Sequence, residues 1–391
     1  MTITSQSSVT SHADVARRLL ANVDAGTSDQ SPVQMKVPAT AYRDPKRWDA
    51  EMEQVFRRSP LVVALSCDLR NPGDYDTLEI AERPLLIVRG DDGVARTFLN
   101  VCRHRGAPVA QGCGHSRRFT CPYHSWVYDT RGGLVGVPGR DTFGELDVSG
   151  LVELTTHERA GLVLAVLTPG LEFDPAEWLA GMDDALTLLR LDELHRYQVL
   201  TDLESPNWKL TADGYVDGYH IGYLHSSTIG EKSITNRNTY DLLGPHVRIG
   251  FANKPITQIR DRPESEWPPL WEVMSMVHYV FPNISISGQP ERPLMVSRLL
   301  PGPTPDRSRT LQYHYYRAPV EGDEATATAE ARRKLYAEVT GQEDFVTGFK
   351  INRSLGALGD DHIRFGRNEC GNQNLHTWID KLVSAGGPVD R

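Results

Sequence analysis

The sequence lacks any long apolar segment, because no run of about 18 apolar residues occurs within its 391 positions. A membrane-spanning helix is therefore not expected. The N-terminus has no apolar core behind a basic start, so a secretory signal is not expected either. Five cysteines do not suggest a disulfide framework in a chain of this length. We therefore expect a cytoplasmic protein whose thiolates remain available for metal.

Positive charge is also scarce: 42 lysine and arginine residues face 51 aspartate and glutamate residues, which gives a net charge of -9. This balance argues against nucleic acid or an anionic membrane surface as the main partner. The hydrophobic share of 39% and the charged share of 24% are ordinary for a globular protein. The length allows two domains with a large buried core.

The residue patterns predict an α+β protein in three parts. Residues 1–38 read as an N-terminal arm with one amphipathic helix at 12–24. Residues 39–165 read as a small all-β domain that opens with a helix at 44–58, where a capping Asp is followed by Pro. Residues 166–391 read as a larger domain with helices, the strands of an antiparallel sheet and a long terminal helical stretch.

Three of the five cysteines lie within residues 102–126, interleaved with three histidines. Cys102 and His104 form a Cys-x-His pair, and Cys121 and His124 form a Cys-x-x-His pair. Zinc also binds two Cys and two His, but zinc fingers usually keep the two Cys in one arm and the two His in the other. One Cys and one His in each arm suit a Rieske-type 2Fe–2S cluster, where two thiolates hold one iron and two imidazoles the other.

A second histidine pair follows about a hundred residues later, in Asp217-x-x-His220-x-x-x-x-His225. On a regular helix Asp217 and His220 share a face, but His220 and His225 lie about 140° apart. Both imidazoles reach one ion only if the helix bends or ends between them, which Gly218 and Gly222 permit. A mononuclear iron(II) site of two His usually adds one carboxylate and leaves positions open for O2 and substrate. The C-terminal segment offers four candidates: Glu343, Asp344, Asp360 and Asp361.

The two motifs together resemble those of the α (oxygenase) subunits of Rieske non-heme iron oxygenases, the ring-hydroxylating dioxygenases and their monooxygenase relatives. The resemblance covers nearly the whole chain and includes Asn207-Trp208-Lys209 and Gln342-Glu343-Asp344. It implies a Rieske domain at 39–165 and a catalytic domain of the helix-grip type at 166–391. It also implies two sets of metal ligands: Cys102, His104, Cys121 and His124 for the cluster, and His220, His225 and Asp344 for the iron.

The resemblance gives Asp217 a catalytic role as a bridge that hydrogen-bonds His220 and, across a subunit boundary, His124 of a neighbouring chain. A head-to-tail contact that closes into a ring implies a trimer (α3), with or without a small β subunit (α3β3). The chain departs from the family at Asp213, where Asn is common. A carboxylate there either acts on the iron, as a weak ligand or by orienting water, or hydrogen-bonds the backbone as Asn would.

The implied function is that of a terminal oxygenase that uses O2. A reductase, alone or with a ferredoxin, supplies electrons from NADH or NADPH, because no Gly-x-Gly-x-x-Gly follows a strand in this chain. We expect cis-dihydroxylation of an aromatic or alicyclic small molecule, with monooxygenation or demethylation as the alternative. A carboxylated substrate would pair with a cation of the expected pocket, where the candidates are Arg237, Arg248 and Lys254.

Two alternative functions other than oxygenase chemistry remain possible from the sequence. A Rieske electron carrier would account for the first motif but would leave the second unexplained. A structural zinc protein would account for four ligands, and it would be colourless where a Rieske protein is red-brown.

Overall fold

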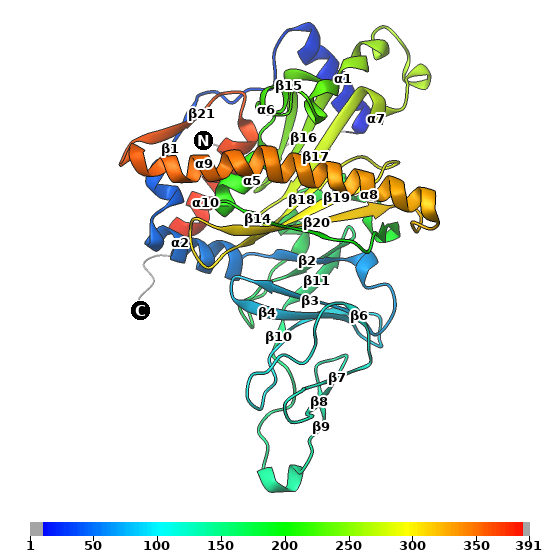
Figure 1. The fold of residues 1–391 in the computed structure, drawn as a ribbon, viewed down its shortest axis with the longest axis vertical. Helices are drawn as coiled ribbons and strands as arrows, with labels where there is room; N and C mark the ends of the chain where they lie inside the picture. Colours follow the sequence, from blue (N-terminus) through cyan, green and yellow to red (C-terminus); the bar gives the residue numbers. More distant parts are fainter. Residues whose placement is uncertain (1–10, 386–391) are drawn as a thin grey trace. The chain divides into compact units, whose positions relative to one another are not determined.

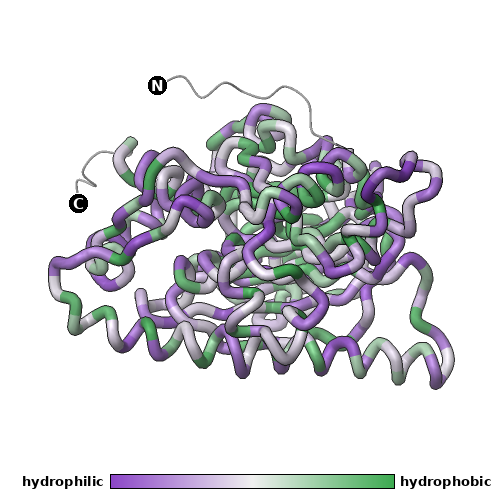
Figure 2. Tube along the Cα trace, turned by 90° about the horizontal axis from the view of Figure 1, so that it is seen from above, coloured by the Kyte–Doolittle hydropathy of each residue, from purple (hydrophilic) through white to green (hydrophobic). Residues whose placement is uncertain are grey.

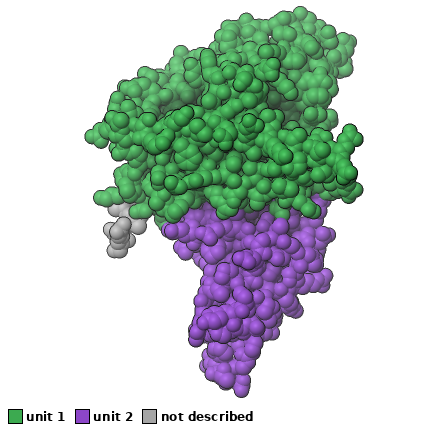
Figure 3. Space-filling model, viewed as in Figure 1, with its two compact units in different colours: residues 1–55, 179–189, 194–391 green, residues 56–178, 190–193 purple. Residues whose placement is uncertain are grey.

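The computed structural model describes residues 11–385, and the chain divides into two compact units (Figure 3). One unit comprises residues 56–178 and 190–193, and the other comprises residues up to 55, 179–189 and 194–391. These boundaries differ from the predicted ones, because the N-terminal segments group with the C-terminal unit. Residues 1–10 of the predicted N-terminal arm lie outside the described residues.

Two contacts explain why the N-terminal arm groups with the larger unit. The predicted helix at 12–24 is confirmed as α1 (His12–Asp24), and it packs on two strands of the large sheet, β15 and β16. The later part of the predicted arm contains the strand β1 (Met35–Pro38), which pairs antiparallel with β21 (His362–Phe365). The predicted helix at 44–58 is α2 (Pro45–Glu51), which Asp44 caps, followed by the π-helix η2 (Met52–Arg57).

The smaller unit is built from three antiparallel sheets, as the short strand-like runs predicted. A five-stranded sheet has the order β10-β5-β4-β3-β6, and the three-stranded sheets have the orders β11-β12-β2 and β7-β8-β9. The strands are β2 (Leu61–Leu65), β3 (Asp74–Ile80), β4 (Arg83–Arg89), β5 (Ala95–Leu99), β6 (Gly114–His115), β7 (Arg118–Thr120), β8 (Val127–Asp129), β9 (Leu134–Gly136), β10 (Glu153–Leu154), β11 (Thr156–Arg159) and β12 (Leu162–Ala165).

The larger unit is organised around one antiparallel sheet of eight strands (Figure 1). Its order is β13-β20-β19-β18-β17-β16-β15, and β14 also pairs with β20. The strands are β13 (His195–Arg196), β14 (Thr201–Ser205), β15 (Ser233–Leu243), β16 (His246–Asn253), β17 (Met274–Val280), β18 (Ile284–Ser287), β19 (Leu294–Pro301) and β20 (Ser308–Tyr316).

Helices surround this sheet and form the second half of the predicted α+β architecture, which is confirmed. A long helical run passes across the sheet in Figure 1, and Figure 2 shows hydrophilic and hydrophobic residues alternating along it. The main helices are α3 (Pro175–Leu179), α4 (Met182–Thr187), α5 (Trp208–Val216), α6 (Ile221–Leu224), α7 (Leu270–Val273), α8 (Asp323–Glu338), the π-helix η9 (Val339–Phe345), α9 (Val346–Ser354) and α10 (Cys370–Ala385).

Opposite faces of the sheet carry different helices. On one face, Val15 and Leu19 of α1 pack with Ala252 and Met276 in a buried hydrophobic cluster. On the other, α5 packs against β17 and β19 and also against α9 and α10. The side chains of a strand alternate between faces, so the register of each strand decides which residues α5 meets. Among the described helices, none is both long and apolar enough to cross a membrane.

Candidate metal centres

The first candidate centre lies at the ends of short strands in the smaller unit. Cys102 and His104 follow β5, and Cys121 and His124 lie in the turn between β7 and β8. The turn is closed by hydrogen bonds of Cys121 N to Trp126 O (2.8 Å) and of Ser125 N to Cys121 O (3.0 Å). These backbone hydrogen bonds fix the conformation of the loop that carries Cys121 and His124.

The donor set of this centre fits a 2Fe–2S cluster of the Rieske type. The thiols of Cys102 and Cys121 are buried, with 2% exposure each. The imidazoles of His104 and His124 are neighbours, with ring centroids 4.5 Å apart, and the Nδ1 atom of each is buried without a hydrogen-bond partner in the described chain. A buried nitrogen without a partner is costly, so two such atoms beside two buried thiols suit a bound metal group.

The second candidate centre depends on an interruption between α5 and α6. Helix α5 ends at Val216, Asp217 is extended (φ -94°, ψ 122°), and His220 and His225 flank the short helix α6. The helix was expected to bend or end between His220 and His225; α5 instead ends earlier, before Asp217, and the short helix α6 occupies the four residues between the two histidines. The glycines serve close approach: a Cβ at Gly218 would lie 2.3 Å from the Asn238 amide nitrogen.

Three side chains converge where the helix breaks. The Nε2 atoms of His220 and His225 lie 3.5 and 3.0 Å from the Oδ1 atom of Asp344. The candidate ligand atoms of these residues all lie within 4.8 Å of one another. With metal–ligand bonds of about 2.1 Å, ligands at neighbouring octahedral corners lie about 3 Å apart, so the set fits one metal ion. Of the four carboxylates offered by the sequence, the structure brings Asp344 to both imidazoles.

A second pair of carboxylates holds the far side of each imidazole. Asp217 Oδ2 lies 2.9 Å from His220 Nδ1, and Glu343 contacts His225 Nδ1. Glu343 also accepts a hydrogen bond from the Thr228 hydroxyl at 3.0 Å. A carboxylate on Nδ1 fixes the tautomer that presents the Nε2 lone pair to a metal. The sequence offered Glu343 only as one of four possible metal ligands. In the structure it instead contacts Nδ1 of His225, on the side of the ring away from the metal position.

The electrostatics of the centre favour positive charge. Burial alone would lower the pKa of His220, but hydrogen bonds to Asp217 and Asp344 outweigh it and raise the pKa to about 10. Burial would likewise raise the pKa of Asp344, but its contacts with the two histidines lower it. Three carboxylates around two imidazoles leave a net negative site whenever the histidines are neutral, and a divalent cation compensates that charge.

Other candidates from the sequence lie elsewhere. Asp361 is exposed and pairs loosely with His362 and Arg364. Arg248 is buried and makes a two-contact ion pair with Asp241 at 2.8 and 2.9 Å, on the sheet face that carries α1. A structural ion pair therefore occupies this arginine, which was a candidate for binding a substrate carboxylate.

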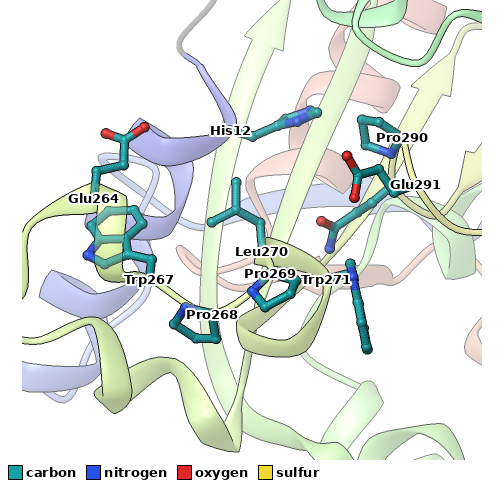
Figure 4. Close-up of a pocket in the computed structure, with 10 residues that line it drawn as sticks. His12, Glu264, Trp267, Pro268, Pro269, Leu270, Trp271, Pro290 and Glu291 are labelled. Carbon is teal, nitrogen blue, oxygen red and sulfur yellow. The ribbon is translucent and has the colours of Figure 1, made fainter.

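A surface cavity of about 330 Å³ lies beside the N-terminal end of α1 (Figure 4). It is lined by His12, Glu264, residues 267–271 and the turn between β18 and β19. The rings of its two tryptophans already make cation–π contacts within the protein: Arg17 lies over Trp267, and Arg292 lies over Trp271. None of the residues of the two metal centres lines this cavity.

Comparison with known proteins places both units in one family. Residues 59–155 match the Rieske [2Fe-2S] domain, and residues 191–385 match the catalytic domain of the ring-hydroxylating alpha subunit. The chain belongs to the family of Rieske oxygenase alpha subunits. Members of this family carry a Rieske 2Fe–2S cluster and a mononuclear iron, and they receive electrons from a reductase.

Similar sequences include oxygenases of two reaction types. The glycine betaine monooxygenase oxygenase subunit of Chromohalobacter salexigens is 31% identical over 48% of this chain and 43% of the relative. The carnitine monooxygenase oxygenase subunit of Escherichia coli K12 is 34% identical over 48% and 52%, and the benzene 1,2-dioxygenase subunit alpha of Pseudomonas putida is 32% identical over 48% and 43%. The chain spans about half the length of the curated relatives it matches.

Solved structures support the fold. The quaternary ammonium Rieske monooxygenase CntA in complex with L-carnitine matches with a TM-score of 0.76 at 21% identity, over 90% of this chain and 96% of that chain. The naphthalene 1,2-dioxygenase of a Rhodococcus species matches with a TM-score of 0.73 at 21% identity, over 96% and 98%.

Proposed function

We propose that this chain is a terminal oxygenase that uses reductase-supplied electrons and O2 to hydroxylate a small organic molecule. The observation that carries the proposal is the convergence of His220 Nε2, His225 Nε2 and Asp344 Oδ1 on one point. Two imidazoles and one carboxylate on one side of an ion leave coordination positions free for O2 and substrate. A Rieske electron carrier has no use for this second site.

Different residues of the chain hold the cluster, the iron and the histidines that bind the iron. When bound, the cluster supplies single electrons and the mononuclear iron supplies O2 chemistry. We assign Cys102, His104, Cys121 and His124 to the cluster, and His220, His225 and Asp344 to the iron. Asp217 and Glu343 hold the Nδ1 protons of the two histidines, which keeps both Nε2 atoms directed at the metal.

Both reaction types of the family remain candidates for this chain. The sequence predicts cis-dihydroxylation of an aromatic or alicyclic compound, and relatives named for benzene and chlorobenzene support that reading. Relatives named for glycine betaine and carnitine support the monooxygenase alternative equally well. Turnover under ¹⁸O2 separates them: two labelled oxygens in the product mean dioxygenation, and one means monooxygenation.

We also propose that electrons pass between copies of the chain in a head-to-tail trimer, from His124 of one copy to Asp217 of the next. Exposed aromatic side chains support contacts at both ends, since Tyr123 beside His124 is 59% exposed and Tyr223 beside the iron site is 62% exposed. CntA, a structural neighbour, is described with inter-subunit electron transfer. A monomer in light scattering of the metal-loaded protein would refute the ring. A ferredoxin, a β subunit and the cytoplasmic location stay predictions.

The proposed function is tested by metal analysis and visible absorption of the purified chain, with Asp344→Ala compared with the wild type. We expect about three irons per chain and Rieske absorption in the wild type, and about two irons with unchanged absorption in the variant. Asp360→Ala, which removes an exposed carboxylate from the same segment, serves as the control and should keep all three. Zinc without colour would exclude the oxygenase, and two irons in an iron-reconstituted wild type would leave an electron carrier.

A further inference from the structure

The backbone that carries His220 lies tightly against strand β15, which runs beside α6 (Figure 1). Gly218 precedes this histidine and Gly222 follows it, and a Cβ atom at either position would collide with a side chain of the strand. At Gly218 the added atom would lie 2.3 Å from Asn238 Nδ2, and at Gly222 it would lie 2.0 Å from Thr235 Oγ1. The two glycines therefore let β15 contact the backbone on both sides of the histidine.

Tyr240 of β15 makes a hydrogen bond to this backbone. Its hydroxyl oxygen accepts from Gly218 N at 3.2 Å, and both residues are buried. Burial raises the pKa of the Tyr240 hydroxyl well above its usual range, and the charge of Asp217 adds to the effect, so the hydroxyl stays neutral. Gly218 N belongs to the peptide group that joins Asp217 to Gly218. The bond therefore fixes the direction in which the chain leaves α5.

Asp217 connects this peptide group to the imidazole of His220. Its Oδ1 atom accepts from Tyr219 N at 2.5 Å, and its Oδ2 atom lies 2.9 Å from His220 Nδ1. Because both oxygens are engaged within the same short segment, the carboxylate cannot turn independently of its backbone. A change in the direction of the peptide group after Asp217 would therefore change the orientation of the His220 ring.

The strand residue at the start of this chain of contacts is itself firmly held. Strand β15 is the last strand in the order of the large sheet, and one side of such a strand has backbone groups without a strand partner. Tyr240 N donates to Asp29 Oδ2 at 2.9 Å, and Tyr240 O accepts from Arg18 at 3.2 Å. Asp29 N donates to Asn238 O at 3.0 Å. Residues of the N-terminal arm thus cover this edge and keep Tyr240 in place.

We propose that Tyr240 is a positioning residue of the oxygenase, which acts through Gly218 N on Asp217 and hence on the orientation of His220. The inference rests on the proposed oxygenase function and adds a residue that is not assigned as a metal ligand. Asp217 also holds the proposed place of electron entry from the next copy of the chain. Tyr240 therefore influences both the arrangement of the iron ligands and the bridge that leads electrons to them.

The test observes the mononuclear iron directly and needs no turnover. Fe²⁺ is bound to protein that retains its cluster, nitric oxide is added, and the electron paramagnetic resonance signal of the adduct reports the arrangement of ligands around the iron. We expect Tyr240→Phe to shift or split this signal and to weaken Fe²⁺ binding about fivefold, less than the loss of a carboxylate that contacts the ligand itself. An unchanged signal would overturn the proposal, whatever the variant does to stability.

Tyr279→Phe separates positioning from stability. Tyr279 of β17 is fully buried, and its hydroxyl donates to Pro282 O at 2.6 Å, so this variant also loses a buried tyrosine hydrogen bond. We expect both variants to lower Tm by about 2–4 °C, and we expect only Tyr240→Phe to change the signal. The same change of signal in Tyr279→Phe would overturn the proposal, because the signal would then follow stability alone.

A second pair of variants displaces the same backbone. Gly218→Ala places a methyl group against Asn238 and Tyr240, whereas a Cβ at Gly214 of α5 meets nothing within 4 Å in the described chain. We expect Gly218→Ala to change the signal and Gly214→Ala to leave it as in the wild type. A wild type that binds no mononuclear iron would overturn the oxygenase function and this proposal together. An iron-loaded Tyr240→Phe with the wild-type signal would overturn this proposal alone.

Discussion

Removal of the Glu343 carboxylate should weaken iron binding although Glu343 is not assigned as a ligand. Glu343 contacts His225 Nδ1 and also accepts from Thr228, so it fixes both the tautomer and the ring orientation of the histidine. Loss of such a partner typically costs 10–100-fold in metal affinity, or about 1.4–2.7 kcal/mol. His225 is only 1% exposed, so water cannot readily replace the lost carboxylate. We therefore expect about a 50-fold loss in Glu343→Ala, in the upper half of that range.

The assay is an anaerobic titration of Fe²⁺ against a competing chelator, with protein that retains its cluster but lacks the mononuclear iron. Cluster absorption reports in the same sample that the fold is intact. Glu343→Gln should lose less affinity than Glu343→Ala, because the amide oxygen can still accept from Nδ1. Glu338→Ala removes an exposed carboxylate from α8 and should leave the affinity unchanged. An affinity of Glu343→Ala within twofold of the wild type would refute the reasoning.

Two further predictions concern the elements that carry the iron site. Lys209 and Glu51 form an ion pair in which neither side chain is more than 2% exposed, and loss of one partner of a buried pair costs about 3–5 kcal/mol. Lys209→Met should therefore lower Tm by about 6–10 °C in a thermal scan, and a fall below about 2 °C would contradict this. Burial and the nearby carboxylates of Asp217 and Asp213 raise the pKa of Glu369 to about 7. The folded state then keeps a proton that the unfolded state loses above about pH 4.5, so Glu369 costs stability progressively as pH rises from about 4.5 to 7. The Tm of Glu369→Gln relative to wild type should rise between pH 5 and pH 8, and a constant difference would show that Glu369 titrates normally.

The sequence could group two members of the candidate iron site, because His220 and His225 are close together in the chain, whereas Asp344 is distant in sequence. The angle between His220 and His225 on an ideal helix required an interruption between them, whereas the structure ends α5 before Asp217 and places the short helix α6 between the two histidines. The choice among the carboxylates was harder, because helical periodicity does not hold in a π-helix. In η9, Asp344 reaches the metal position and Glu343 reaches the opposite nitrogen of His225. No spacing rule distinguishes these neighbouring acids.

A row of three fully buried polar side chains in the large sheet could not be predicted from the sequence in the same way. Ser285, Ser297 and Gln312 lie on three strands, and only the pairing register brings them together. The available signal was weak: polar residues within otherwise apolar runs such as ISIS and LMVSRLL. The residues of β16 are divided between the two faces of the sheet, since Arg248, one of the cations expected in the pocket, lies on the side of α1 and its neighbours in sequence point the other way.

Asp213, the position where the resemblance led us to expect Asn, is held by residues distant in the chain. Its side chain accepts from the Tyr42 hydroxyl at 2.7 Å, lies 3.0 Å from His376 Nε2 and receives a hydrogen bond from Asn372 at 3.2 Å. A carboxylate that is 9% exposed needs several such partners to remain in the core. Neither alternative from the sequence describes this arrangement, because the oxygens meet side chains of η1 (Ala39–Tyr42) and α10 and are absent from the set that converges with Asp344. The carboxylate therefore joins the N-terminal segment and the last described helix to α5, one helical turn before Asp217, and so helps to place the residue that holds His220.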